Sequence, residues 1–221
     1  MYNPINNYKN YEKTRFNFTK KRKAVWQEIA RYLQKHISPD SSVLELGSGY
    51  CDFINSISAS KKYAIDKYID PHKYADKNVT KIMGDFKDMN TNLKDNSIDV
   101  IFASNFFEHL SEKEIENYFK VITKKLKDKG LLIIIQPNYR LCYASYYDDY
   151  THIKAFSDVS MRDFLISKGF SVSLIKPGFL PFSMKSALPK TRFLVRLYLN
   201  SPIKPFAKQM LVMARLNKER N

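Results

Sequence analysis

The stretch Val43-Leu44-Glu45-Leu46-Gly47-Ser48-Gly49 decides the fold of this chain, because a short apolar run stops at two glycines separated by one residue. An apolar strand that turns sharply beneath a bound ligand needs glycine where a Cβ would clash. Asp66 lies roughly 20 residues after the glycines, at the end of a second apolar run, where a carboxylate can accept hydrogen bonds from ribose hydroxyls. The pattern therefore predicts a nucleotide-binding loop.

Strand-like and helix-like segments alternate along the rest of the chain. The sequence predicts strands at 42–46, 62–66, 79–83, 98–104, 131–136, 170–176 and 209–215. It predicts helices at 19–37, 50–58, 111–129, 158–168 and within 185–200. Ser111 begins a capping box, and Gly130 and Gly169 are expected to end helices in the left-handed conformation. Such alternation predicts a doubly wound, mostly parallel α/β sheet of seven strands, whose last strand can run antiparallel.

Length and composition are typical of one domain with appendages, since 221 residues with 44% hydrophobic content can bury one sizeable core. We expect a helical cap in residues 1–40, a cofactor-binding core in 41–176, and a basic lid with the final strand in 177–221. The two cysteines are too few for a disulfide framework and suggest a reducing compartment. Neither a signal peptide nor an apolar run of about 18 residues is present, so we expect a cytoplasmic protein.

The net charge of +15 is concentrated near the two ends of the chain. Residues 1–36 and 176–221 together hold 19 of the 37 basic residues but only three of the 22 acidic ones. A basic field of this kind raises the local concentration of anionic partners, whether phosphorylated small molecules, anionic lipid or RNA. A solubilising surface without a partner explains the same charge equally well.

Several motifs together resemble the class I S-adenosylmethionine-dependent methyltransferases. They are Glu45-Leu-Gly47-Ser-Gly49, Asp66, the Gly84-Asp85 pair, and the run from Asp99 to Asn105. The segments 137–140 and 149–157 further resemble a small bacterial branch that often acts on sugars, cell-surface precursors or other metabolites. The resemblance covers roughly residues 40–176 by motif and 209–215 by position, and it implies a Rossmann-like sheet with S-adenosylmethionine as cofactor.

The residues around the glycines favour this cofactor over a dinucleotide. A dinucleotide fingerprint needs a third small residue where the pyrophosphate meets the helix N-terminus, and that position is Asp52 here. Its carboxylate would repel pyrophosphate, whereas S-adenosylmethionine has no phosphate and is positively charged at its sulfur and amino group. Glu45 adds a second carboxylate. The family's usual third glycine is Cys51, which costs little if its φ is negative.

The resemblance implies a role for each matching residue. Asp66 is expected to bind the ribose hydroxyls and Lys67 to line the adenine side. Asp85 is expected to bind the adenine amino group, with Phe86 beside the ring. Asn105 follows the fourth strand, where family members bring the methyl group to the substrate. The expected cofactor-binding set is Glu45, Gly47, Ser48, Gly49, Asp66, Lys67, Asp85, Phe86 and Asn105.

Methyl transfer to a hydroxyl requires alignment of acceptor and sulfonium and removal of the hydroxyl proton. His152, in the loop after the fifth strand, is the preferred base, and His109 is the second candidate. Asp148 and Asp149 with His152 lack a third carboxylate at a matching spacing, so no metal site is predicted. The expected substrate-binding residues are Tyr139, Arg140, Tyr150, Lys185 and Arg192.

The sequence therefore predicts an O-methyltransferase that acts on a small anionic, sugar or nucleotide-linked metabolite such as a cell-surface polysaccharide precursor. DNA is not expected as a substrate, because Ser104-Asn105-Phe106-Phe107 differs from the Asn/Asp-Pro-Pro-aromatic motif of base amino methylation. An RNA methyltransferase that uses the basic termini is the second interpretation, and a non-catalytic S-adenosylmethionine-binding subunit is the third. The oligomeric state stays open.

Overall fold

The structure, a computed structural model, describes residues 20–181 and 191–218, which form one seven-stranded sheet in the order β3-β2-β1-β4-β5-β7-β6. Its strands are β1 (Ser42–Leu46), β2 (Lys61–Asp66), β3 (Val79–Met83), β4 (Ile98–Ser104), β5 (Leu126–Pro137), β6 (Phe170–Pro181) and β7 (Ala207–Leu216). The first five strands pair in parallel, whereas β7 runs antiparallel between β5 and β6. The predicted doubly wound sheet with an antiparallel last strand is confirmed.

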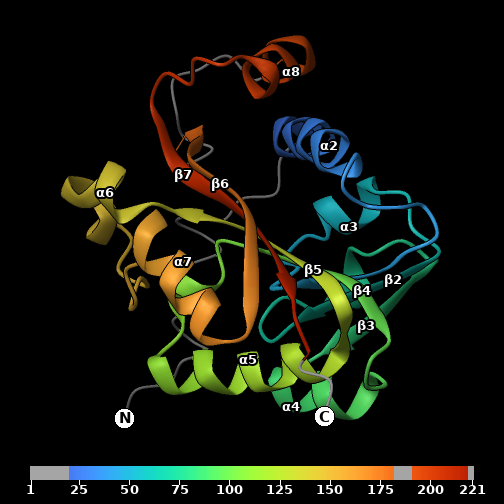
Figure 1. The fold of residues 1–221 in the computed structure, drawn as a ribbon. Helices are drawn as coiled ribbons and strands as arrows, with labels where there is room; N and C mark the ends of the chain where they lie inside the picture. Colours follow the sequence, from blue (N-terminus) through green and yellow to red (C-terminus); the bar gives the residue numbers. More distant parts are fainter. Residues whose placement is uncertain (1–19, 182–190, 219–221) are drawn as a thin grey trace.

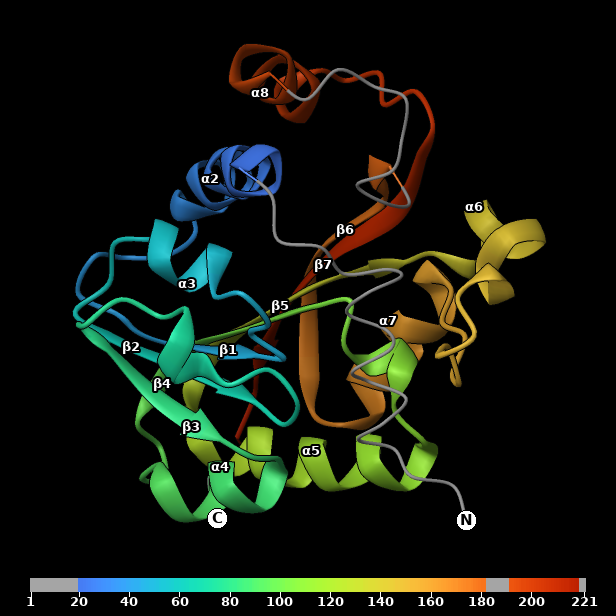
Figure 2. The ribbon, with the colours of Figure 1, turned by 180° about the vertical axis from the view of Figure 1, so that it is seen from behind.

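Helices cover both faces of this sheet (Figures 1 and 2). One face carries α2 (Lys20–Gln34) and α3 (Asp52–Ser56), with α8 (Arg192–Asn200) packed against α2. The other face carries α4 (Phe86–Asn92), α5 (Glu112–Lys125) and α7 (Asp158–Ser167). Short connections contain α6 (Tyr139–Cys142) and the 3₁₀ turns η1 (Pro71–Lys73), η2 (Phe107–His109) and η3 (Tyr143–Asp148).

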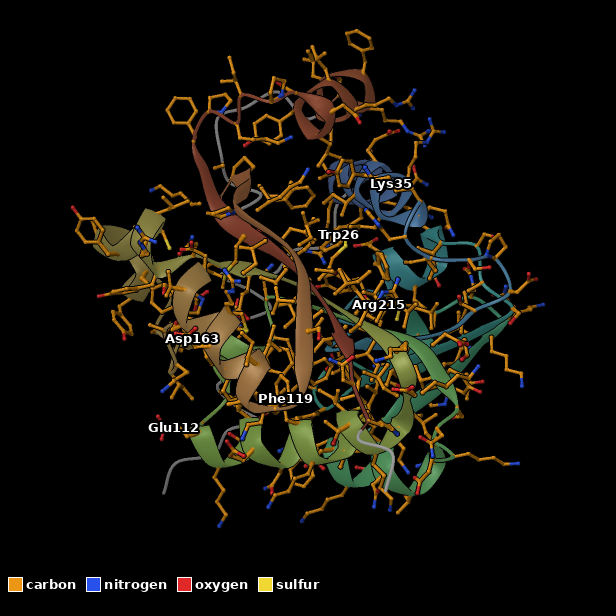
Figure 3. The ribbon with its side chains drawn as sticks, viewed as in Figure 1. Trp26, Lys35, Glu112, Phe119, Asp163 and Arg215 are labelled. Carbon is orange, nitrogen blue, oxygen red and sulfur yellow. The ribbon has the colours of Figure 1, made fainter. Side chains whose placement is uncertain are left out.

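Each face of the sheet has its own aromatic core. On the α2 face, Phe102 of β4 stacks on Phe53 with ring centroids 3.7 Å apart, and Trp26 meets the same ring edge-on at 6.2 Å. On the α5 face, Phe119 contacts the rings of Phe107, Phe164 and Phe170. Trp26 and Phe119 thus belong to opposite cores, each on the sheet side of its helix (Figure 3). Burial of both faces explains why the strands are continuous apolar runs.

The boundary between α5 and β5 differs from the prediction. The helix ends at Lys125, not near Lys129, because Leu126 already pairs with Ile98 as the first residue of β5. Lys129 adopts the left-handed conformation, with φ of +59°, and the prediction of a left-handed Gly130 is wrong. Gly130 is needed for space instead, since a Cβ there would lie 2.8 Å from the carbonyl oxygen of Lys127.

Other helix ends follow the sequence more closely. Ser111 forms the predicted capping box with Glu114, and Gly169, with φ of +82°, follows α7 as expected. The helix expected at 50–58 is confined to Asp52–Ser56, and α4 was not predicted. The predicted helix within 185–200 is described from Arg192 onward. Among the described helices, none combines the length and apolarity needed to cross a lipid bilayer.

Candidate functional site

Three buried side chains near the carboxyl ends of the central strands carry polar atoms with no hydrogen-bond partner among the described residues. They are Ser48 after β1, Glu108 after β4 and Gln136 in β5. Folded proteins leave few such atoms unpaired, and a ligand is one way to satisfy them. The strand order reverses between β1 and β4, and ligands of doubly wound sheets bind at the carboxyl end of that switch point. This edge is the candidate site.

The glycine loop has a left-handed residue at every second position from 47 to 51. Gly47 and Gly49 have φ of +61° and +51°, and Cys51 has φ of +58°. The angle at Cys51, which the sequence left open, is positive, and an L-residue there costs about 1–2 kcal/mol. A Cβ on Gly47 would approach the Phe106 ring to 2.5 Å. Gly47 is thus required both by its backbone angle and by the aromatic ring from the loop after β4.

Asp66 joins the loops that follow β1 and β2. Its Oδ2 accepts a hydrogen bond from the backbone N–H of Gly49 at 2.9 Å. Its Oδ1 accepts from the N–H groups of Tyr68 and Ile69, both at 2.8 Å. The carboxylate therefore holds the glycine loop in place in addition to the predicted role at the ribose.

Glu45 and Asp52 lie buried behind the glycine loop. Glu45 accepts a hydrogen bond from the N–H of Ile54 at 3.1 Å, and burial raises its pKa well above the usual glutamate value. Asp52 forms an ion pair with Arg22 of α2 at 2.7 Å. Arg22 offsets the charge of Asp52, and burial opposes the charge of Glu45. The carboxylates therefore repel an anionic cofactor less strongly than the sequence suggests.

The predicted adenine side is built around the start of α4. Asp85 caps this helix by accepting from the N–H of Lys87 at 2.9 Å, and its other oxygen lies 3.5 Å from Lys67 Nζ. Phe86 packs edge-on against Tyr118, with ring centroids 5.4 Å apart, and Tyr118 in turn meets Phe106 at 5.0 Å. A continuous row of aromatic rings thus connects the adenine side with the ring that contacts Gly47.

Asn105 links three strands at the sheet edge. It adopts the left-handed conformation, with φ of +47°, which asparagine tolerates better than most residues. Its N–H donates to the carbonyl of Ile135, and its side-chain oxygen accepts from Gln209 at 2.8 Å. These contacts give Asn105 a structural role, and its predicted contact with the cofactor stays a prediction.

The loops after β4 and β5 meet at Glu108. Its carbonyl oxygen accepts from the N–H groups of Ile153 at 2.7 Å and Lys154 at 3.1 Å. These two bonds bring His152 beside His109, and their ring centroids lie 5.0 Å apart. The ligand atoms of Glu108, His109 and His152 all lie within 4.8 Å of one another. The structure thus unites the two predicted bases with a buried carboxylate, and we call these three residues the Glu108 cluster.

Burial changes the protonation of this cluster. It raises the pKa of Glu108 to about 8. It lowers the pKa of His109 to about 4, with a further contribution from His152. The side chain of Glu108 is 1% exposed, whereas that of His109 is 22% exposed. A neutral His109 near pH 7 carries a lone pair that can accept a proton or bind a metal ion.

The predicted substrate residues do not all gather at this edge. Tyr139 and Tyr150 are exposed in the segment between β5 and α7, and Arg140 there lies 3.5 Å from Asp158. Arg192 instead lies on α8, paired with Glu28 of α2 at 3.3 Å, on the face opposite η2. Its predicted contact with the substrate stays a prediction. Lys185 lies outside the described residues.

A family model described as a methyltransferase domain matches residues 16–173, which is more than half of the chain. The chain belongs to the class I S-adenosylmethionine-dependent methyltransferases. The cofactor of this family is S-adenosylmethionine. The loop with the left-handed Gly47 and Gly49 fits this ligand, because the buried Ser48 hydroxyl between them has no hydrogen-bond partner among the described residues. When bound, the cofactor supplies an electrophilic methyl group on a positively charged sulfur.

Solved structures share the fold of this methyltransferase. A chain from the complex of the Haloferax volcanii Trm112 methyltransferase activator with a methyltransferase superposes with a TM-score of 0.67 at 14% identity, covering 90% of this chain and 92% of that one. A SAM-dependent methyltransferase from Archaeoglobus fulgidus gives 0.64 at 20% identity, covering 94% and 99%. Geranyl diphosphate methyltransferase in complex with SAM gives 0.62 at 10% identity, covering 86% and 84%. No curated protein matches by sequence.

The sequence assigned no role to Glu108. It also did not predict that Thr151 Oγ1 and the Tyr146 carbonyl hold the two imidazoles. The sequence does contain one signal for Glu108, which is a carboxylate directly before a histidine just after a parallel strand. The contact between the two loops depends on backbone hydrogen bonds, which no side-chain pattern predicts.

Proposed function

We propose that this methyltransferase transfers the methyl group of S-adenosylmethionine to a hydroxyl oxygen of a small metabolite, and that the acceptor hydroxyl is bound at the Glu108 cluster. The observation that carries the proposal is the buried Glu108 carboxylate, which has no hydrogen-bond partner among the described residues. Phe106, two residues earlier, packs so close to the cofactor loop that a Cβ on Gly47 would lie 2.5 Å from its ring. This proximity supports the proposal that the acceptor is bound beside the cofactor.

In the reaction, the acceptor oxygen bonds to the methyl carbon as the carbon–sulfur bond breaks, and the hydroxyl proton must leave. In this proposal, His109 or His152 accepts that proton. General acid–base assistance of this kind is worth about 10²–10⁴ in rate. Replacement of either histidine by alanine is thus expected to lower kcat by a factor in that range. His72, an exposed histidine paired with Asp70, provides the control His72→Ala, which should keep full activity.

A ring-bearing, anionic acceptor such as a nucleotide-linked sugar fits the surroundings of the cluster. Tyr143, Tyr147 and Tyr150 are exposed in the adjoining segment and offer ring faces for stacking. Arg140 and Lys154 lie in the same segment, and both can attract phosphate. We infer from this composition that the acceptor combines a sugar or ring with a negative charge, as a cell-surface polysaccharide precursor does.

The proposal is tested in two steps. Isothermal titration with S-adenosylmethionine comes first, and a folded sample that does not bind the cofactor contradicts the proposal at its base. Cell extracts are then incubated with the enzyme and methyl-labelled cofactor, and labelled products are identified by mass spectrometry. A label on a hydroxyl oxygen of a small anionic metabolite supports the proposal, whereas a label on nitrogen or carbon overturns it. Cofactor binding without transfer to any acceptor, even with partner proteins added, would favour the non-catalytic subunit.

An RNA methyltransferase is the second candidate, favoured by a basic groove on the α2 face. Lys23, Arg31 and Arg192 line this groove, whose volume is about 340 Å³. Contacts to phosphate predict that RNA affinity falls steeply as salt rises. The measurement is binding of short RNA in dilute and in physiological salt, for the wild type and for Lys23→Ala/Arg31→Ala. Lys113→Ala on α5 is the control. The RNA methyltransferase is contradicted if the affinity for RNA is the same in both salt concentrations and is unchanged in Lys23→Ala/Arg31→Ala.

A further inference from the structure

The Glu108 carboxylate is hard to explain as a purely structural group. It is 1% exposed, and neither of its oxygens has a hydrogen-bond partner among the described residues. The Nε2 atom of His109 lies 3.9 Å from one carboxylate oxygen, which is too far for a hydrogen bond. Burial of an unpaired carboxylate is costly unless a cation or a donor compensates it. A cation or hydrogen-bond donor beyond those that the described residues supply is therefore expected at Glu108.

The hydrogen bonds of His109 determine which of its nitrogens carries the lone pair. The hydroxyl of Thr151 donates to Asp149 Oδ1 at 2.6 Å, so toward His109 Nδ1, 2.9 Å away, Thr151 Oγ1 can only accept. The carbonyl oxygen of Thr151, 3.3 Å from the same nitrogen, is also an acceptor. Nδ1 is thus the protonated nitrogen, and the lone pair resides on Nε2, the atom that faces Glu108.

The same reasoning applies to His152. Its Nδ1 lies 2.7 Å from the carbonyl oxygen of Tyr146, which can only accept. Nδ1 therefore carries the proton, and Nε2 carries the lone pair. Tyr146 is fully buried, and its own hydroxyl donates to the carbonyl of Lys154 at 2.7 Å, so the carbonyl that orients His152 is itself held in place. Metal-binding histidines commonly donate their second nitrogen in this manner, because it sets the tautomer and the ring orientation.

We propose that Glu108, His109 and His152 together bind a divalent transition-metal ion, with Zn²⁺ or Mn²⁺ as the fitting ions. One carboxylate oxygen and two imidazole nitrogens form a donor set for such ions. Ligand atoms at about 2.0–2.2 Å from an ion lie roughly 3.3 Å from one another. The three atoms here lie within 4.8 Å of one another, so side-chain adjustments of about 1 Å would close the site. The positive ion would also compensate the buried carboxylate.

Three protein ligands leave at least one coordination position open, as in catalytic metal sites. If the proposed function holds, that position would receive the acceptor hydroxyl. A metal ion lowers the pKa of a hydroxyl bound to it, so the hydroxyl proton can pass to water while both imidazoles keep their lone pairs on the ion. The ion would then replace proton uptake by a histidine. This catalytic role rests on the proposed function, whereas binding of the ion does not.

The test measures metal binding without cofactor or acceptor. The purified chain is dialysed against a chelator, the chelator is removed, and Zn²⁺ and Mn²⁺ are titrated by calorimetry. We expect one site per chain, and Co²⁺ bound there should give the visible absorption of nitrogen and oxygen coordination. Loss of a residue that only hydrogen-bonds to a metal ligand typically lowers metal affinity 10–100-fold. Loss of a ligand itself, in Glu108→Gln or His152→Gln, should therefore lower the metal affinity at least about 100-fold. Circular dichroism confirms that each variant is folded.

His72→Gln is the matched control, because it removes an exposed imidazole that already contacts the Asp70 carboxylate at 2.8 Å. It should leave the metal affinity unchanged. The inference is overturned if the wild type shows no one-to-one site, or if folded Glu108→Gln and His152→Gln bind metal as tightly as the wild type. Methyl transfer that survives complete chelation would overturn the catalytic role of the ion. Metal binding in a chain that methylates no hydroxyl would instead contradict only the proposed function.

Discussion

Lys129 is an exposed residue in a backbone conformation that L-residues avoid. Its φ is +59°, and its side chain contributes one exposed contact, to Asn217 at 2.7 Å. Replacement by glycine removes the steric cost of the left-handed conformation but adds freedom to the unfolded chain. We expect Lys129→Gly to raise the free energy of unfolding by about 0.5–1 kcal/mol, measured by urea denaturation.

Lys120 provides the control for this prediction. It is exposed within α5, where glycine is disfavoured, so Lys120→Gly should lower the free energy of unfolding by about 1 kcal/mol. Replacement of lysine by glycine is thus expected to raise the free energy of unfolding at position 129 and to lower it at position 120. Destabilisation in both variants would show that the left-handed conformation of Lys129 is not strained.

Glu45 should couple cofactor binding to pH. Burial raises its pKa well above the usual glutamate value, so in the free protein it retains a proton to a higher pH than an ordinary glutamate. A positively charged cofactor beside it favours the ionised form and lowers that pKa. Binding is therefore expected to release a proton, and the affinity should increase as pH rises toward the pKa of the free protein.

Calorimetry in buffers of different ionisation enthalpy counts the released proton. The observed binding enthalpy should depend on the buffer for the wild type and lose that dependence in Glu45→Gln. Asp40→Asn, which changes an exposed carboxylate before β1, should behave as the wild type does. A wild-type enthalpy that is the same in every buffer at pH values around the raised pKa would contradict the prediction.

The sequence identified residues at strand ends but not contacts between loops. The positions of Glu45, the glycines and Asp66 near the ends of β1 and β2 could be predicted from the short apolar runs, whereas their contacts with a cofactor stay predictions. Glu108 could not be assigned a role, because its proximity to His152 depends on how the loop after β5 packs against the loop after β4. Cys51 shows a second limit, since residue type alone favours a negative φ, and the tertiary structure imposes a positive one.

At the scale of elements, α8 is attached to α2 through one buried carboxylate. Arg196 contacts both oxygens of Glu28, at 2.9 and 3.1 Å, and Arg192 adds a third contact at 3.3 Å. Hydrogen bonding by Arg196 lowers the pKa of Glu28 below its ordinary value. A carboxyl whose folded-state pKa is lowered stabilises the fold above its unfolded pKa, and this stabilisation is lost as pH falls through the folded pKa.

Glu28→Gln is therefore expected to loosen α8 without unfolding the sheet. The arginines are about half exposed, so the coupling is worth only about 1 kcal/mol. Hydrogen exchange of the α8 amides should be faster in the variant at neutral pH, and the difference should vanish only below the lowered pKa that Glu28 has in the folded protein. Glu116→Gln on α5, which removes the pairing with Lys168 at the end of α7, should not change exchange in α8. Equal exchange in all three proteins would contradict the role of Glu28.

The elements themselves were largely predictable, because their apolar periodicity is strong. The seven strands and the antiparallel direction of β7 are confirmed, whereas the boundary between α5 and β5 was misplaced. Glycine at position 130 looked like a helix terminator, but pairing of the buried Leu126 with Ile98 outweighs the local preference and begins the strand five residues earlier than predicted.

At the scale of the whole molecule, the two aromatic cores share one sheet and should unfold together. Trp26, the single tryptophan, reports on the α2 face, because it meets Phe102 at 6.2 Å. Far-ultraviolet circular dichroism reports on both faces. Coincident transitions by different probes are the mark of two-state unfolding. We expect the fluorescence and dichroism midpoints to agree in urea.

S-adenosylmethionine should shift both midpoints by the same amount. A ligand present at 100 times its Kd raises the free energy of unfolding by about 2.7 kcal/mol when it binds only the folded state. Asp66 joins the loops of β1 and β2, so Asp66→Ala should lose most of this shift and also destabilise the free protein, because three backbone N–H groups lose their acceptor. Asp163→Ala, on the first turns of α7, is the control and should keep the full shift (Figure 3). The contrary outcome is a cofactor-induced shift of the dichroism midpoint without a shift of the Trp26 fluorescence midpoint. It would show that the α2 face unfolds independently of the cofactor loop, which contradicts the cooperative unfolding expected from the shared sheet.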